Sequence, residues 1–378
     1  MDAQTLTHPP ARVVHHPNAK VGVLLFNLGG PDSLANVKPF LYNLFNDGDM
    51  VQLGIPPLLQ RLFAWRISNK REHEAQENYE RIGGRSPLEP LSREQGEHLG
   101  DWLAQQGKRV NIYMAMRCWH PMTAEAVKAM KADGIERLIL LPLYPHYSLA
   151  TTGSSWRELK RHWPTLEQDV ELATVCAYYD DPTYLAALAD TVATTLQRFA
   201  PDVRDQVHVV FSAHGLPQNY VKKNKDPYPQ HCMATATALM QTYFPQLSWQ
   251  MAYQSKVGPL QWLTPYTEDL LPELGKTGTR YLMLVPLSFV SEHIETLYEM
   301  DMLYQPLALE HGVVQCERVP ALNSHPTFIQ ALGQLVLRAM HQESTCRIQW
   351  PHLAHPSAAV PGFVCGSATP EAVTHAVG

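Results

Sequence analysis

The chain has 378 residues, of which 45% are hydrophobic and 17% are charged, and its formal net charge is −6. This length favours two α/β domains, and the composition excludes a disordered chain. The acidic balance excludes the basic surface of a nucleic-acid-binding protein, so we expect no nucleic-acid partner. Six scattered cysteines without a CxxC pair predict neither a disulfide framework nor a four-thiolate metal site.

The first twenty residues are polar and lack the apolar run of a signal peptide. We predict that residues 1–20 are a disordered N-terminal segment. The longest apolar runs, such as LILLPLY, are much shorter than the roughly 20 residues that cross a bilayer. We therefore expect a cytoplasmic protein with no transmembrane segment, and the sequence is compatible with peripheral contact with a membrane.

Four apolar segments occur twice along the chain, in the same order. The pairs are VGVLLFNLGGP with VHVVFSAHGLP, NIYMAMR with SWQMAYQ, RLILLPLY with RYLMLVPLS, and DPTYLAAL with HPTFIQAL. Because strand-like segments alternate with helical stretches in both copies, we predict an α/β fold of two similar doubly wound, Rossmann-like domains with parallel sheets. Ligands bind outside the carboxyl ends of such strands, so the interdomain cleft is the expected site.

The repeats also predict the domain boundaries. The N-terminal domain covers 21–190, the C-terminal domain covers 191–342, and a loosely ordered tail covers 343–378. The first copy is longer between its first two strands, which indicates an insertion at about 35–85. Its apolar start, IPPLLQRLFAW, favours a lip over the site, and an extra helical hairpin packed on the domain is the alternative.

Titratable side chains follow two strands of the second copy. His214 ends the first strand, and Glu292, His293 and Glu295 follow the third strand at the same edge of the sheet. On a regular helix Glu292, Glu295 and Glu299 would share a face, where burial and repulsion would raise their pKa values. If His293 and Glu295 both face the cleft, the turn must be non-helical or a π-turn. The structural alternatives are a hydrogen-bonded core histidine and an ordinary acidic first helical turn.

The matching edge of the first copy is mostly apolar. It carries Leu28, Arg117 and Tyr144, a wall with a single cation. The LGGP segment lacks the glycine spacing of a dinucleotide fingerprint. A large, flat apolar ligand therefore suits this wall better than a phosphate.

The sequence resembles the ferrochelatase family from about residue 21 to 340. The matching stretches are LLFNLGGPDS, NYERIGGRSPLEPLSREQ, YMAMRCWHP, LPLYPHYSLATTGSS, VVFSAHGLP, DPYPQ, YQSKVGPLQWLTP and SFVSEHIETLYE. The resemblance implies a class II chelatase-like fold and an enzyme that inserts Fe²⁺ into a porphyrin, releasing two protons. Iron is then a substrate, and no resident cofactor is required.

The resemblance also implies roles for individual residues. His214, Glu295 and His293 match catalytic positions, with His214 and Glu295 associated with metal binding and with taking the pyrrole protons. Glu292 and Glu299 form a conduit for protons or metal. The substrate-binding positions are Leu28, Arg71, Tyr79, Ser86, Arg117, Tyr144 and Trp262. We expect a neutral imidazole at His214 and a carboxylate at Glu295 to accept protons near pH 7.

One departure from the family argues against a cofactor. Leu149 stands where cluster-binding members have a mid-chain cysteine, and the tail holds only Cys346 and Cys365, so we expect no iron–sulfur cluster. We expect a monomer that acts on protoporphyrin, with coproporphyrin or another tetrapyrrole as the alternative. A non-catalytic two-domain binding protein and a two-domain glycosyltransferase are rival interpretations, disfavoured by the absence of a secretion signal and of an evident nucleotide site.

Overall fold

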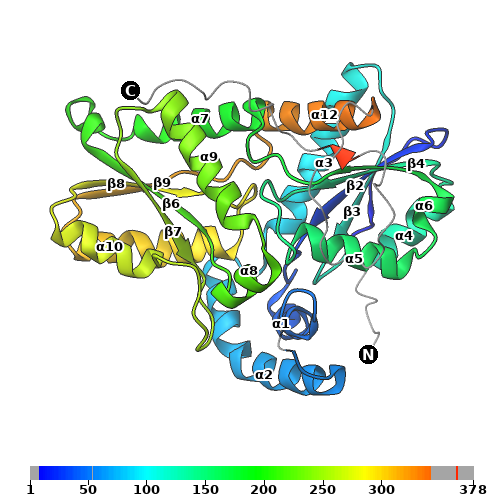
Figure 1. Ribbon diagram of the computed structural model, residues 1–378, viewed down its shortest axis with the longest axis horizontal. Helices are drawn as coiled ribbons and strands as arrows, with labels where there is room; N and C mark the ends of the chain where they lie inside the picture. The colour runs from blue at the N-terminus through cyan, green and yellow to red at the C-terminus, as the bar shows by residue number, and fades with distance from the viewer. Residues whose placement is uncertain (1–7, 53, 342–362, 365–378) are drawn as a thin grey trace.

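The chain forms two β-sheets, parallel except for β1, and helices cover each of them (Figure 1). The computed structural model describes residues 8–52, 54–341 and 363–364. The strands of the first sheet, in spatial order, are β1(Arg12–Val14), β3(Asn111–Met116), β2(Val21–Asn27), β4(Arg137–Pro142), β5(Glu171–Val175) and β10(Phe363–Val364). Those of the second are β7(Trp249–Gln254), β6(Val207–His214), β8(Tyr281–Pro286) and β9(Gln315–Arg318).

The two sheets share one strand order. In each, the first strand of the repeat lies between the second and the third, and the fourth follows the third. The central strands are mostly apolar because helices bury both faces of a parallel sheet. The prediction of two similar doubly wound domains is confirmed.

Helices connect the strands and cover both sheets. The α-helices are α1(Val37–Asn46), α2(Pro57–Arg81), α3(Leu88–Gln105), α4(Thr123–Ala132), α5(Thr152–His162), α6(Leu166–Asp169), α7(Pro182–Leu196), α8(Gln218–Asn224), α9(Tyr228–Tyr243), α10(Thr267–Lys276), α11(Gln305–Glu310) and α12(Pro326–Met340). Two short 3₁₀ helices, η1(Leu34–Asn36) and η2(Pro201–Gln206), and a π-helix, η3(Glu295–Tyr304), complete the set in the described residues.

The last helix of each repeat contacts the other half of the molecule. α12 packs against α3, α7 and strands β4 and β5 of the first sheet, and α7 packs against α9 (Figure 1). At Gly333 of α12, an added Cβ would lie 2.1 Å from the indole of Trp102 in α3, so this crossing needs glycine. One hydrophobic core therefore runs from the first sheet into the second, across the boundary that the repeats place at residue 190.

Two segments outside the repeats behave in different ways. The prediction that residues 1–20 are disordered is wrong for the described part, because Arg12–Val14 form β1 and pair antiparallel with β3. The insertion forms the helical hairpin of α1 and α2. Large apolar side chains of α2, including Leu58, Leu62 and Trp65, remain exposed. The predicted tail at 343–378 lies outside the described residues except for the short strand β10, which pairs with β5.

Candidate active site

The second sheet brings an imidazole and a carboxylate together at its carboxyl edge. His214 is the last residue of β6, and Glu295 is the first residue of η3, which follows the neighbouring strand β8. The His214 Nδ1 lies 2.9 Å from the Glu295 Oε2. The Nε2 of His293 lies 3.7 Å from the same oxygen. The three catalytic residues predicted from the sequence therefore form one cluster.

Backbone contacts hold His214 in this orientation. The Ser288 hydroxyl accepts a hydrogen bond from the His214 N–H at 2.9 Å, and the Tyr228 hydroxyl donates to its carbonyl at 2.9 Å. The ring of Trp262 stands edge-on to the imidazole, with centroids 6.2 Å apart. The His214 side chain is still 36% exposed, so a ligand can reach the ring.

The π-helix explains how His293 and Glu295 reach the same point. Residues 292 and 293 are not helical, and π-helical hydrogen bonding runs from Glu295 to Tyr304. The expectation of a non-helical or π-turn is therefore confirmed, and a regular helix at this position is excluded. Such distortions are common at functional sites.

Burial and charge act in opposite directions on the His214–Glu295 pair. Burial lowers the pKa of His214, but the charge and hydrogen bond of Glu295 and the charge of Glu299 outweigh it, and the pKa is raised. Burial raises the pKa of Glu295, but His214 and His293 outweigh it and hold that pKa well below its usual range. Relative to the isolated groups, the pair therefore shifts toward the imidazolium and the carboxylate.

Glu299 follows the sequence-based expectation for its pKa. Burial and the charge of Glu295 raise the pKa of Glu299 to about 7, although hydrogen bonds from Ser255 and Gln254 oppose the shift. The Ser255 hydroxyl donates to the Glu299 Oε2 at 2.7 Å, and the Gln254 amide donates to it at 3.1 Å. A carboxyl group with this pKa can accept or release a proton near neutral pH.

Glu292 has different surroundings. Its Oε1 lies 2.8 Å from the Arg318 Nη1 and accepts the Ala321 N–H at 2.9 Å, and its Oε2 accepts the Thr296 hydroxyl. These contacts tie the start of η3 to the segment after β9. The continuous row of three glutamates expected from a regular helix is not formed, because the chain enters the helix only after His293.

The first half contributes apolar groups to the same region. Leu28, at the end of β2, and the buried Tyr79 of α2 share a hydrophobic cluster with Ile294, the residue before Glu295. Burial raises the pKa of the Tyr79 hydroxyl, and the charge of Glu295 adds to this shift. The insertion and both sheets thus meet beside Glu295.

Other residues predicted to bind the substrate have contacts of their own. The side chain of Arg117 is only 7% exposed, and its guanidinium lies 2.6 Å from Asp47, 3.2 Å from Glu158 and 3.5 Å from Asp49. It therefore does not offer the wall an unpaired cation. The sequence could not show this, because the acids come from the insertion and from α5, both distant along the chain.

Tyr144, Ser86 and Arg71 complete the predicted substrate-binding set. Tyr144 is half-buried against the core of the first sheet. Ser86 is buried beside Gly30 and lines a cavity of about 90 Å³ with Arg85 and Trp119. The Arg71 guanidinium lies over the ring of Phe45, 5.9 Å from its centroid. None of the three has a described contact with His214 or Glu295.

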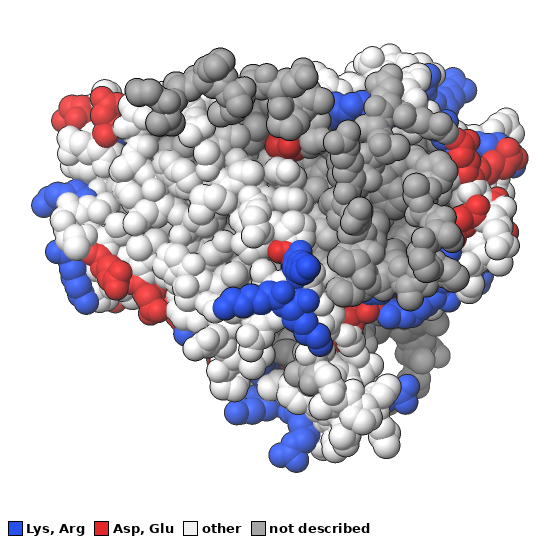
Figure 2. Space-filling model, in the orientation of Figure 1, with Lys and Arg blue, Asp and Glu red and all other residues white. Residues whose placement is uncertain are grey.

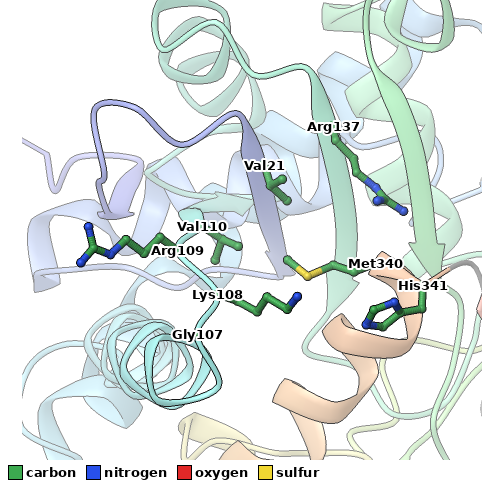
Figure 3. A pocket seen from close by; sticks show the side chains of 8 residues that line it. All are labelled: Val21, Gly107, Lys108, Arg109, Val110, Arg137, Met340 and His341. Atoms are coloured by element: carbon green, nitrogen blue, oxygen red, sulfur yellow. The ribbon is translucent and has the colours of Figure 1, made fainter.

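A larger cavity, of about 320 Å³, lies at the opposite edge of the first sheet. Val21 and Arg137, which line it, begin β2 and β4. Figure 3 shows Lys108, Arg137 and His341 around Met340, with Arg109 turned away. Lys108 follows the C-terminus of α3, where a cation offsets the helix dipole, so its charge has a structural explanation.

Sequence reasoning missed Gln254, the last residue of β7. Gln254 is buried and lies opposite His214 in the strand register. The sequence carried a signal for this residue, because the alignment of NIYMAMR with SWQMAYQ places Gln254 at the position of Arg117, a predicted substrate-binding residue. Among the described residues, no group of three or more His, Cys, Asp and Glu side chains is arranged to hold a metal ion.

Comparison with known proteins gives one consistent result. A family model described as Ferrochelatase matches residues 20–340. A ferrochelatase of Rippkaea orientalis is 47% identical over 340 residues, covering 89% of this chain and 86% of that protein. A ferrochelatase of Synechocystis is 46% identical over 336 residues, covering 88% and 86%. The solved structure of SirB from Bacillus subtilis with Fe³⁺ has a TM-score of 0.50 at 14% identity, covering 84% of this chain and 95% of that one, which supports the fold.

None of the described helices is both long and apolar enough to cross a bilayer.

Proposed function

The chain belongs to the ferrochelatase family, enzymes that insert ferrous iron into a porphyrin in heme synthesis, and we propose that its own porphyrin is protoporphyrin IX. The reaction exchanges two pyrrole protons for one Fe²⁺ and yields protoheme. The observation that carries the site assignment is the contact between His214 and Glu295 at the carboxyl edge of the second sheet. Coproporphyrin is the alternative substrate.

The pair suits a reaction in which protons and a metal ion trade places. With its Nδ1 against Glu295, His214 has its Nε2 as the nitrogen that can accept a proton or bind iron. Imidazole and carboxylate both suit Fe²⁺, and a carboxylate behind a ligating imidazole fixes its orientation. An imidazolium at His214 must first lose its Nε2 proton, while the Nδ1 proton stays in the hydrogen bond with Glu295. Glu299, with a pKa of about 7, is our proposed acceptor for it.

The apolar surroundings supply binding energy for the ring. Leu28, Trp262 and the α2 insertion offer nonpolar surface next to the pair. Binding energy from such surface can hold a macrocycle in a bent form, at a typical strain of about 1–5 kcal/mol. A bent ring exposes its N–H groups to the imidazole and the lone pairs of its other nitrogens to the metal.

Substitution of the pair tests this assignment. We expect His214→Ala and Glu295→Gln each to lower the rate of metal insertion by about a hundredfold or more, because each removes a group that handles protons or metal. The measurement is an anaerobic absorbance assay with Fe²⁺ and, in parallel, protoporphyrin IX and coproporphyrin. The exposed His98→Gln serves as a control. A folded His214→Ala protein with normal turnover would contradict the assignment, and faster metallation of coproporphyrin would overturn the proposed substrate.

We also propose a cytoplasmic location with peripheral contact between α2 and a membrane surface. Leu58, Leu59, Leu62 and Trp65 of α2 are 50–75% exposed. From Val51 to Arg71 the sequence has four cations and no acid, although the whole chain is acidic. Figure 2 shows Lys and Arg but no acidic residue over the lowest part of this face, where α2 lies. Apolar and basic residues on one helix match an anionic lipid surface.

A further inference from the structure

A chain of buried polar side chains lies behind the catalytic pair. Ser212, Gln254 and Thr267 are each 2% exposed or less, in the core of the second domain where the strands are otherwise apolar. Burying polar groups is unfavourable unless their hydrogen bonds are made, so a fully connected network of this kind specifies one arrangement.

The direction of the hydrogen bonds can be deduced from the donors available. The Ser212 hydroxyl donates to the Gln254 Oε1 at 2.7 Å. A hydroxyl has one hydrogen, and Ser212 already uses its own. In the 2.8 Å contact between Ser212 and Thr267, Thr267 must therefore donate and Ser212 must accept. The Glu295 carbonyl can only accept, so the Gln254 amide nitrogen must face it and the amide oxygen must face Ser212.

That orientation directs both amide N–H groups toward η3. The Gln254 Nε2 donates to the backbone carbonyl of Glu295 at 3.0 Å and to the Glu299 Oε2 at 3.1 Å. Ser255 donates to the same carboxylate oxygen at 2.7 Å, from a backbone with φ of +63° that a non-glycine residue rarely adopts. One side chain thus contacts the first turn of the π-helix at both of its acidic residues.

We propose that Gln254 is a positioning residue for metal insertion, fixed by Ser212 and Thr267 so that it holds Glu295 and Glu299 in register with His214. His214 and Gln254 are paired in the register of β6 and β7, so the amide links the strand that carries the imidazole to the helix that carries the carboxylates. The inference rests on the assignment of His214 and Glu295 proposed above.

The test compares Gln254→Leu, Ser212→Ala and the double variant. Each single variant should lower kcat by about 10- to 100-fold, in the range seen when a residue behind a ligand is removed. The KM for the porphyrin should stay unchanged, because neither residue reaches the surface of the site. The double variant should be no slower than Gln254→Leu, since both changes break the same chain. Thr195→Val, an equally buried threonine bonded only within α7, should keep the parent kcat.

The outcomes separate this inference from the proposed function. Parent-like kcat in both single variants would overturn it, as would a raised KM with unchanged kcat, additive losses in the double variant, or an equal loss in Thr195→Val. If Gln254→Leu does not fold, the kcat values of Ser212→Ala and Thr195→Val still test the proposal. Normal turnover in Glu295→Gln would instead refute the site assignment, whatever the Gln254 variants do.

Discussion

At the scale of single residues, opposing electrostatic effects give neighbouring groups different roles. Burial by itself would favour the neutral forms of His214 and Glu295, yet their mutual attraction shifts both pKa values toward the charged forms. Glu299 experiences burial and the charge of Glu295 without a cationic hydrogen-bond partner, so its pKa rises to about 7. Glu295 and Glu299, four residues apart, thus differ in pKa: Glu295 stays ionised, and Glu299 exchanges protons near neutral pH.

These shifts predict a pH dependence of metal insertion. His214 and Glu299 must both be unprotonated before they can take up protons or iron, so activity should rise as the pH increases through about 7. In Glu299→Gln this acid limb should move to lower pH, because one titrating group is lost and the charge that helps to raise the pKa of His214 is removed.

The measurement is kcat as a function of pH for the parent and the variant. The exposed Glu310→Gln on α11 is the control and should keep the parent profile. If the acid limb of the kcat profile has the same midpoint in Glu299→Gln as in the parent, groups other than Glu299 determine this limb.

At the scale of elements, the insertion and the π-helix place the functional groups. Arg117 anchors the insertion by pairing with Asp47 and Asp49 after α1. Its guanidinium therefore helps to hold the α1–α2 hairpin in place against the first sheet. The insertion is a packed helical hairpin with apolar residues exposed to solvent, and its role as a lip over the site stays a prediction.

The exposed face of α2 predicts binding to lipid vesicles. Burying a leucine side chain contributes about 1.5–3 kcal/mol, so Leu59→Asp should weaken binding to vesicles that contain anionic lipid by about tenfold or more. Leu309→Asp on α11 is the matched control, because Leu59 is 50% exposed and Leu309 is 47% exposed. Sedimentation with vesicles of neutral and of anionic lipid measures both. Equal binding of the two variants, or no binding by the parent, would contradict membrane contact at α2.

At the scale of the whole molecule, buried polar contacts dock the two halves. After β4, the His146 Nε2 lies 2.9 Å from the Thr235 Oγ1 of α9, and the Tyr147 N–H donates to the Nδ1 of His231 at 3.2 Å. The carboxylate of Asp226 accepts the Ser148 hydroxyl at 2.9 Å. These contacts cross between the halves, so the interface depends on histidines that stay neutral.

Burial lowers the pKa of His146 to about 3 and that of His231 to about 4. The unfolded chain binds protons at these residues below about pH 6.5, and the folded chain does not, so stability should fall as the pH drops from about 6.5 toward 4. Each residue contributes up to about 1.4 kcal/mol per pH unit over this window.

Thermal denaturation at several pH values measures this dependence. His146→Phe should be less stable at pH 7, because it loses the contact with Thr235, and its melting temperature should depend less steeply on pH. The exposed His98→Gln should keep the parent slope. A slope unchanged in His146→Phe would exclude this residue as a source of acid sensitivity.

From the sequence alone came the repeat, the two doubly wound domains and the cluster of His214, His293 and Glu295. These follow from local information, because apolar periodicity marks the strands and parallel strands deliver their last residues to one edge. Tertiary structure alone decided which polar groups meet. Contacts between segments far apart in the chain place the acids around Arg117, the arginine beside Glu292 and the amide of Gln254. Such contacts also pack α7 and α12 each against the other half of the molecule. Local patterning carries no record of such contacts, and the pKa values that follow from them could be known only once burial and neighbours were in place.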